Sequence, residues 1–178
     1  MQILHRDIRS ENIVITDHDI AKITNFNADT EDQIVNNECI RYRAPEMLNK
    51  GEEMETKYDA KCEVYSFGIL LWEIAECKIP YEGFEDIKEI KERVINGDRE
   101  QFTVVGIPDK YKNLVYKSVK RNPDLRPTFA EILVELRDIF IPERKELSWI
   151  RKAIKNKSVN CIEWDDLTDL SQIGCGHF

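Results

Sequence analysis

The sequence predicts a mainly α-helical fold with one small β-hairpin close to its amino end. Apolar residues recur at helical spacing between residues 59 and 140, and two short strand-like runs flank a polar turn between residues 13 and 23. The chain has 178 residues, of which 42% are hydrophobic, and this size and composition suit one domain.

The first predicted elements are a hairpin and a loop. Residues 13–15 and 20–23 form the strand-like runs, and the turn-forming residues 16–19 join them. Residues 25–43 are polar and have no apolar period, so they predict a long loop of the kind that is often functional. A short helix is expected to begin at Ala44-Pro45-Glu46, because a first turn tolerates proline.

The strongest predicted helix runs from Asp59 to Cys77. It is apolar on nearly every side, which is typical of a helix that is buried rather than half exposed. We expect Pro80 to end it, because proline cannot continue a helix.

Three more helices are predicted after the central one. The first covers about residues 86–96 and is followed by Gly97, a residue typical of helix ends, and the second covers about residues 109–120. Thr128 and Glu131 form a capping box that announces the third. The predicted apolar face of this third helix consists of Ile132, Leu133, Leu136 and Ile139.

Charge and cysteine content exclude several classes of function. A formal net charge of −8 argues against nucleic-acid binding, which needs a basic surface. Five widely spaced cysteines without a CxxC pair argue against zinc and against a disulfide framework, and they suit a reduced compartment. No apolar run is long enough to span a bilayer. We therefore expect a cytoplasmic protein that binds neither nucleic acid nor membrane.

Four short motifs follow one another in a fixed order. Residues 5–12 read His-Arg-Asp-Ile-Arg-Ser-Glu-Asn, residues 44–46 read Ala-Pro-Glu, residues 63–68 read Glu-Val-Tyr-Ser-Phe-Gly, and residues 126–127 read Arg-Pro. Together they resemble the catalytic (C-terminal) lobe of the protein kinase family. The sequence around the third motif resembles that of the tyrosine kinase-like group, which includes pseudokinases. The resemblance covers about residues 1–140.

The resemblance implies roles for the residues of the first motif. Asp7 is expected to accept the proton of the substrate hydroxyl, Asn12 to bind a metal ion, and Arg9 to contact the transferred phosphate. Val14 is expected to contact the nucleotide. ATP and Mg²⁺ are the implied cofactors, and a protein substrate or signalling partner is the implied ligand. Glu46 of the second motif is expected to pair with the Arg126 of the fourth.

The metal site departs from the family pattern. Asn25-Phe26-Asn27 stands where the resemblance implies Asp-Phe-Gly, so Asn25 is the candidate second ligand for Mg²⁺ and nucleotide. Magnesium prefers charged oxygen ligands, and an amide supplies only a neutral carbonyl. The sequence therefore predicts a kinase with impaired phosphoryl transfer. The alternatives are a catalytically dead pseudokinase that acts as an interaction module and a helical scaffold unrelated to kinases.

Three further positions bear on the site. Glu63 replaces an aspartate that braces the catalytic loop in relatives, and its additional methylene is expected to disturb that brace. Cys39 stands where a threonine usually contacts the catalytic base. Thr30 and Tyr42 are the phosphoacceptors available in residues 25–46.

The ends of the chain predict a junction between two units. The glycine-rich loop and the lysine strand of the family do not precede His5, so the resemblance implies that the amino-terminal lobe is missing. Residues 141–158 are predicted to form a basic helical linker. Residues 159–178 are predicted to begin a second kinase-like unit in tandem, with Gly174 and Gly176 in a phosphate-binding loop that is cut short.

Overall fold

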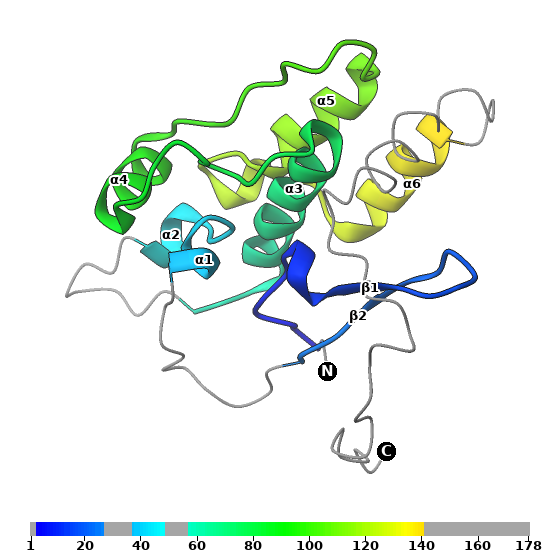
Figure 1. The fold of residues 1–178 in the computed structure, drawn as a ribbon, viewed down its shortest axis with the longest axis horizontal. Coiled ribbons are helices and arrows are strands. Elements are labelled where there is room, and N and C mark those ends of the chain that lie inside the picture. The colour runs from blue at the N-terminus through cyan, green and yellow to red at the C-terminus, as the bar shows by residue number, and fades with distance from the viewer. Residues whose placement is uncertain (1–2, 27–36, 49–56, 141–178) are drawn as a thin grey trace.

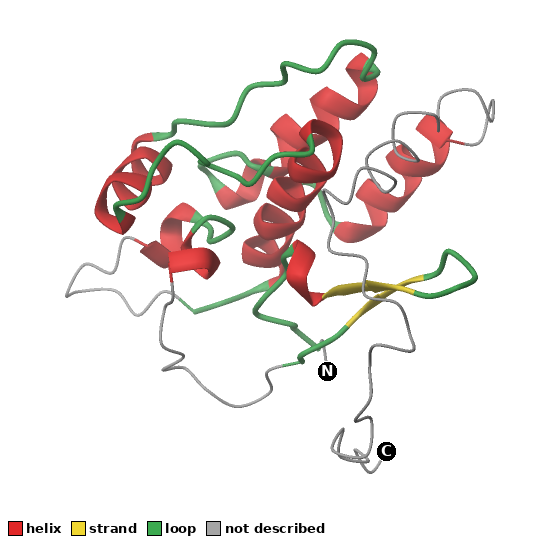
Figure 2. Cartoon of the chain, in the orientation of Figure 1, coloured by secondary structure: helices red, strands yellow, loops and turns green. Residues whose placement is uncertain are grey.

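The computed structural model describes residues 3–26, 37–48 and 57–140. In these residues the fold is mainly helical with a single two-stranded sheet, as predicted (Figures 1 and 2). The elements are η1 (Ser10–Asn12), β1 (Ile13–Ile15), β2 (Ala21–Ile23), α1 (Asn37–Ile40), α2 (Pro45–Leu48), α3 (Ala60–Glu76), α4 (Ile87–Asn96), α5 (Asp109–Ser118), η2 (Pro123–Leu125) and α6 (Phe129–Phe140).

The predicted hairpin is confirmed. Strands β1 and β2 pair antiparallel with Val14 opposite Lys22, and the turn is closed by a hydrogen bond from the Thr16 N–H to the Ile20 carbonyl (3.0 Å). The second strand begins one residue later than predicted, because Ile20 belongs to this turn and is 54% exposed. The hairpin follows directly on η1, so it holds the end of the segment that carries Asp7.

Helix α3 runs through the middle of the molecule (Figure 1) and is buried on nearly every side, as predicted. Its first turn is capped by the Asp59 carboxylate, which accepts from the N–H groups of Lys61 (2.8 Å) and Cys62 (3.1 Å). The predicted bounds, Asp59 and Cys77, are confirmed as the two caps of the helix, although Cys77 rather than Pro80 interrupts it. Cys77 adopts a left-handed backbone conformation (φ 56°) that interrupts the helical repeat three residues before the proline.

Two groups of buried side chains cover α3 from different sides. One contains Tyr65 and Ile69 of α3 with side chains of α2 and α4, and the other contains Val64 and Leu71 with side chains of α5 and α6. Helices α3 and α5 approach closely at Gly68, where an added Cβ atom would lie 2.7 Å from the Ser118 Cβ. The central helix therefore forms the common wall of both halves of the core.

The later helices match their predictions closely. Gly97 ends α4 with a φ of 95°, and α5 ends at Ser118, two residues earlier than expected. In the capping box of α6, the Thr128 N–H donates to Glu131 Oε2 (2.7 Å) and the Glu131 N–H donates to Thr128 Oγ1 (3.3 Å). Leu133 was wrongly placed on the apolar face, since it is 58% exposed. The buried face of α6 instead follows the i, i+7 pair Ile132 and Ile139, with Leu136 partly buried beside them.

The predicted loop of residues 25–43 contains one helical turn. Helix α1 occupies Asn37–Ile40, and the buried side chain of Ile40 (4% exposed) anchors it in the core. Burial of this single apolar residue explains a turn that periodicity could not predict. Helix α2 begins at Pro45, where a short helix was expected.

Candidate functional site

The catalytic loop, residues 5–12, lies against α3 and brings the predicted catalytic residues together. Asp7 is the centre of this arrangement. Its Oδ2 atom accepts from Asn12 Nδ2 (2.8 Å) and Arg9 Nε (3.2 Å), and its Oδ1 atom accepts from Cys39 Sγ (3.5 Å). Three donors from two segments thus orient the carboxylate that was predicted to act as the base.

The two predicted metal ligands bind each other. Asn25 Nδ2 donates to Asn12 Oδ1 at 2.9 Å. The Nδ2 atom of Asn12 is committed to Asp7, because it donates to both the main-chain oxygen (2.7 Å) and the Oδ2 atom of that residue (2.8 Å). The side-chain oxygen of Asn12 must therefore face position 25. The amide of Asn25 in turn points its Nδ2 donor toward this oxygen.

This direct contact does not fit a magnesium ion. Magnesium prefers charged oxygen ligands, whereas Asn12 and Asn25 are neutral amides and one lone pair of the Asn12 oxygen already accepts a hydrogen bond. An aspartate at position 25 would place a carboxylate against this oxygen, which is repulsive unless a cation lies between them. Within the described part of the chain, no cluster of three or more His, Cys, Asp and Glu side chains could hold a metal ion either.

His5 supports the catalytic loop from the side of the hairpin. Its Nε2 atom lies 2.7 Å from the Thr24 carbonyl oxygen, and its Nδ1 atom accepts from the Asp7 N–H (3.3 Å). These partners require the neutral tautomer that carries its proton on Nε2. The Phe26 ring packs edge-on against the imidazole at a centroid distance of 4.5 Å. Phe26 thus keeps a packing role although Asn25 has lost the charge of the family's aspartate.

Glu63 braces the catalytic loop despite its additional methylene. Its Oε1 atom accepts from the Arg6 N–H at 2.7 Å, and Arg6 holds a left-handed backbone conformation (φ 72°). Burial raises the pKa of the Glu63 carboxyl, and the hydrogen bonds from the main chain of residues 5 and 6 oppose this rise. The expected disturbance of the brace is not seen.

Cys39 contacts Asp7, the predicted catalytic base, in the position where the resemblance implied a threonine. Burial, followed by the charge of Asp7, raises the pKa of the Cys39 thiol, so the group is protonated and can donate at neutral pH. Tyr42 is an unsuitable phosphoacceptor here, because it is 8% exposed and its hydroxyl is engaged with Glu73 (2.7 Å). Thr30 lies outside the described residues.

Two other predicted site residues have different surroundings. Arg9 contacts Asp7 and pairs with Glu11 (Nη1 to Oε2, 2.6 Å), and its contact with a phosphate stays a prediction. Val14 lies on β1 and is only 3% exposed. Its contact with a nucleotide stays a prediction.

The expected long-range pair between Glu46 and Arg126 is present. Arg126 Nη1 and Nη2 donate to the two carboxylate oxygens of Glu46 at 2.6 and 2.8 Å. The guanidinium is completely buried, and its other N–H groups donate to main-chain oxygens of α3 and of the segment before η2. The pair ties the beginning of α2 to the beginning of α6.

Arg41 is a structural residue that the sequence did not reveal. Its guanidinium donates to the carbonyl oxygens of Pro80 (2.7 Å), Tyr81 (2.6 Å) and Phe84 (2.9 Å). No local pattern could have identified these acceptors, because they are main-chain atoms some 40 residues away. This contact fixes the segment between α3 and α4 against the residues that follow α1.

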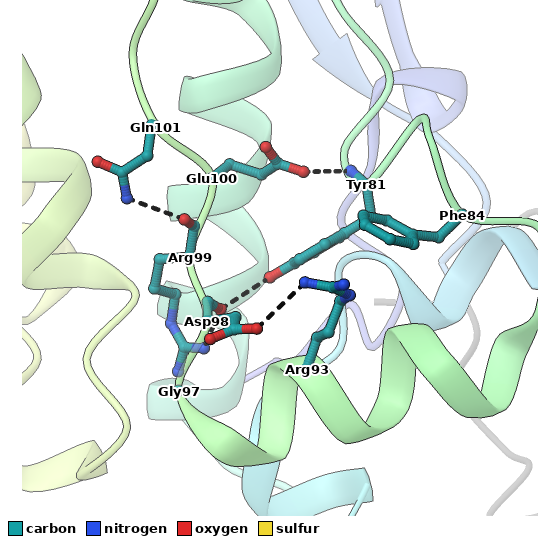
Figure 3. A pocket seen from close by; sticks show the side chains of 8 residues that line it. All are labelled: Tyr81, Phe84, Arg93, Gly97, Asp98, Arg99, Glu100 and Gln101. Atoms are coloured by element: carbon teal, nitrogen blue, oxygen red, sulfur yellow. Dashed lines mark hydrogen bonds and ion pairs between the residues drawn. The ribbon is translucent and has the colours of Figure 1, made fainter.

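A cleft in the described residues lies away from the catalytic loop. It measures about 410 Å³ and lies between α4, the segment before it and residues 97–101 (Figure 3). Its polar groups largely satisfy one another: Glu100 accepts from the Tyr81 N–H (2.6 Å), and Arg93 pairs with Asp98 (3.3 Å). None of the predicted site residues lines this cleft.

The remaining predictions concern the carboxyl-terminal part of the chain. The basic linker at residues 141–158 and the second unit at residues 159–178, with Gly174 and Gly176, lie outside the described residues and stay predictions. In the helices that the structure describes, none is long and apolar enough to cross a membrane.

Comparison with known proteins establishes the family. A family profile described as "Protein tyrosine and serine/threonine kinase" matches residues 1–136. The dual specificity protein kinase pyk3 of Dictyostelium discoideum is 32% identical over 160 residues, which cover 88% of this chain and 12% of pyk3. A putative mitogen-activated protein kinase kinase kinase 7-like protein of Drosophila melanogaster is 33% identical over 141 residues, covering 73% of this chain and 34% of that protein.

A third relative is a probable LIM domain-containing serine/threonine-protein kinase of Dictyostelium discoideum. It is 35% identical over 144 residues, which cover 77% of this chain and 14% of that kinase. The profile and the relatives place this chain in the protein kinase family. The chain spans between 12% and 34% of the length of these three relatives.

Proposed function

We propose that this chain belongs to a kinase in which transfer of phosphate from ATP to a protein hydroxyl is impaired, because its metal site is closed by an amide pair. The observation that carries the proposal is the 2.9 Å hydrogen bond between Asn25 Nδ2 and Asn12 Oδ1. The catalytic carboxylate of Asp7 remains oriented by its donors, so the deficit is confined to metal binding.

The size of the expected deficit follows from the lost charge. A unit charge at about 4 Å from another is worth about 4 kcal/mol at intermediate screening, and more against a divalent cation. At about 1.4 kcal/mol per decade of rate, the missing carboxylate slows transfer by about a thousandfold. A signalling role that depends on shape rather than on catalysis is the second candidate function, and the closed amide pair favours it as well.

The test compares phosphotransfer by the full-length protein with MgATP and a protein substrate. The wild type is expected to show background transfer, and Asn25→Asp is expected to raise the rate by at least tenfold because it restores a charged ligand. Asn113→Asp, the same exchange on the exposed surface of α5, is the matched control and is expected to change nothing.

Metal binding provides a readout that does not require activity. Titration of the protein with Mn²⁺, followed by electron paramagnetic resonance, is expected to show tighter binding for Asn25→Asp than for the wild type. Robust transfer by the wild type that Asp7→Asn abolishes would refute impairment. If Asn25→Asp gains metal affinity but no transfer, the purely signalling role is favoured.

We also propose that the protein belongs to the tyrosine kinase-like group and acts in the cytoplasm. The sequence around α3 supports the first point. The second is supported by Cys62 and Cys77, which are not in disulfides in the described residues, as is usual in a reduced compartment. Fractionation of cells that produce the full-length protein tests the location.

A further inference from the structure

The sequence has one asparagine that is followed by glycine, Asn96 at the end of α4. The main-chain nitrogen of the next residue can attack an asparagine side chain, and glycine has no side chain to obstruct this attack. Asn96 is exposed, so water reaches it. The other described asparagines are followed by larger residues or, at Asn122, by proline, which has no N–H group. The local sequence therefore makes Asn96 the most reactive of these asparagines.

The reaction open to Asn96 is deamidation through a cyclic imide. After the Gly97 N–H loses its proton, the nitrogen attacks Cγ of Asn96. The new N–Cγ bond closes the imide ring while the Cγ–Nδ2 bond breaks, and Nδ2 leaves as ammonia with the proton. Water then opens the imide at either carbonyl, which leaves a carboxylate and returns a proton to the nitrogen. The products are aspartate and isoaspartate, and water is the co-reactant.

The cap of α4 restrains the nitrogen that attacks. The Gly97 N–H donates to the carbonyl oxygens of Arg93 (3.1 Å) and Val94 (3.2 Å), and the Asp98 N–H also donates to that of Arg93 (3.0 Å). Gly97 has a φ of 95°, which ends the helix at this residue. Because both carbonyls stabilise its N–H group, the Gly97 nitrogen is free to attack only when the last turn of α4 opens.

Two arginines hold this last turn closed. Arg99 Nη1 donates to the carbonyl oxygens of Val94 (3.1 Å) and Asp98 (2.6 Å). The Nε atom of the same arginine donates to the carbonyl oxygen of Val119, which follows α5 (2.7 Å). Arg93 pairs with the Asp98 carboxylate at 3.3 Å (Figure 3). Opening of the turn therefore also requires contacts outside α4 to break.

We propose that Asn96 is a site of spontaneous deamidation and that the cap of α4 sets the rate of this reaction. The product carries a carboxylate where the carbonyl end of the helix already has partial negative charge, and Asp98 adds a like charge two residues later. Deamidation thus weakens the cap that restrained it. Gly97 and Asp98 line the cleft of Figure 3, so the reaction adds negative charge beside that cleft.

Peptide mapping of the full-length protein by mass spectrometry measures the reaction. The protein is kept at neutral pH with and without guanidinium chloride, and aspartate and isoaspartate at position 96 are followed over time. Deamidation is expected to be slower in the folded than in the unfolded protein by about tenfold or more, since the hydrogen bonds of the cap must first break. Asn113, which precedes a leucine, is the internal reference and is expected to react more slowly than Asn96 in the unfolded chain.

Arg99→Lys tests the role of the cap, because a lysine cannot reproduce the fork of donors. It is expected to speed deamidation of the folded protein by about threefold or more and to leave the unfolded rate unchanged. Arg137→Lys on the exposed side of α6 is the matched control and is expected to change neither rate. If Arg99→Lys does not fold, Asp98→Ala decides the matter, since it removes the pair with Arg93 and should raise the ratio of folded to unfolded rates.

Variants of Asn96 itself test the effect of the product. Asn96→Asp carries one of the two products and is expected to speed amide hydrogen exchange at Gly97 and Asp98 by about threefold. Asn96→Gln keeps the amide, but its longer side chain closes an imide far more slowly. It is expected to leave exchange unchanged and to give no product at position 96.

Three results would overturn the proposed site. They are a rate for Asn96 in the unfolded chain no higher than that of Asn113, equal rates in folded and unfolded protein, and a folded protein without product after the unfolded protein is fully converted. A folded rate in Arg99→Lys equal to that of the wild type would overturn the role of the cap. These measurements involve neither metal nor nucleotide, so their failure is distinct from failure of the proposed function.

Discussion

The buried pair of Glu46 and Arg126 allows the most direct test of the tertiary structure. The guanidinium of Arg126 is completely buried, whereas the carboxylate of Glu46 is 18% exposed. All five N–H groups of the arginine find acceptors, two of them on Glu46. Glu46→Gln leaves one buried N–H facing an NH₂ group and removes the compensating charge.

The loss of stability follows from this geometry. Removing one partner of a buried ion pair costs about 3–5 kcal/mol, and the partial exposure of Glu46 places this case near the lower end. With a urea dependence of about 2 kcal/mol per molar, a loss of about 3 kcal/mol lowers the unfolding midpoint by about 1.5 M. Circular dichroism of the helices follows the transition.

The matched control is the pair of Glu89 and Arg93 on α4. It is an i, i+4 pair at 3.3 Å whose side chains are 48% and 39% exposed. Glu89→Gln is expected to cost less than about 0.5 kcal/mol, because exposed pairs are screened by water. Equal midpoint shifts in Glu89→Gln and Glu46→Gln, or no shift in the latter, would refute the reasoning.

Two further predictions concern packing and pH. Gly68→Ala places a Cβ atom 2.7 Å from the Ser118 Cβ and is expected to destabilise the fold by about 1–2 kcal/mol in urea unfolding, after the gain in helix propensity is subtracted. Gly83→Ala, which meets nothing within 4 Å, is its control, and an equal loss there would contradict the packing argument. Burial raises the pKa of Glu76, but the hydrogen bonds from Thr103 and Val104 lower it by more, so the pKa lies below its ordinary 4.5. The stability that Glu76 contributes is therefore present above pH 4.5 and is lost as the pH falls through the folded pKa. The difference in unfolding free energy between the wild type and Glu76→Gln should shrink on acidification. A difference that stays constant with pH would contradict this prediction.

Local patterns were sufficient for most helices and for the catalytic loop. The capping box of Thr128 and Glu131 and the glycine at position 97 were visible in the sequence, because caps depend on residues within one turn of each other. The end of α3 at Cys77 was also predicted, but the conformation of that residue was not, since a left-handed cysteine has no sequence signal. Likewise, Leu133 fits an apolar helical pattern and nevertheless lies on the exposed side of α6.

The sequence predicted which residues belong to the site, but it did not predict their contacts. The resemblance to kinase motifs identified Asp7, Asn12 and Asn25, and it marked Glu63 as a substitution. That Glu63 still braces the loop depends on where α3 lies relative to Arg6, 57 residues earlier. Nor did any local pattern indicate that Glu73 of this helix accepts from the hydroxyls of Ser10 and Tyr42.

By itself, the sequence determined the family, the order of the elements and the identity of the catalytic loop. These follow from motifs and periodicities that span a few residues, because the interactions behind them join residues that are close together in the sequence. Only the tertiary structure decided that Asn12 binds Asn25, that Glu73 holds two hydroxyls and that Arg126 finds five acceptors. Such contacts join residues far apart in the chain, and their geometry is set by the packing of α3 against every segment around it.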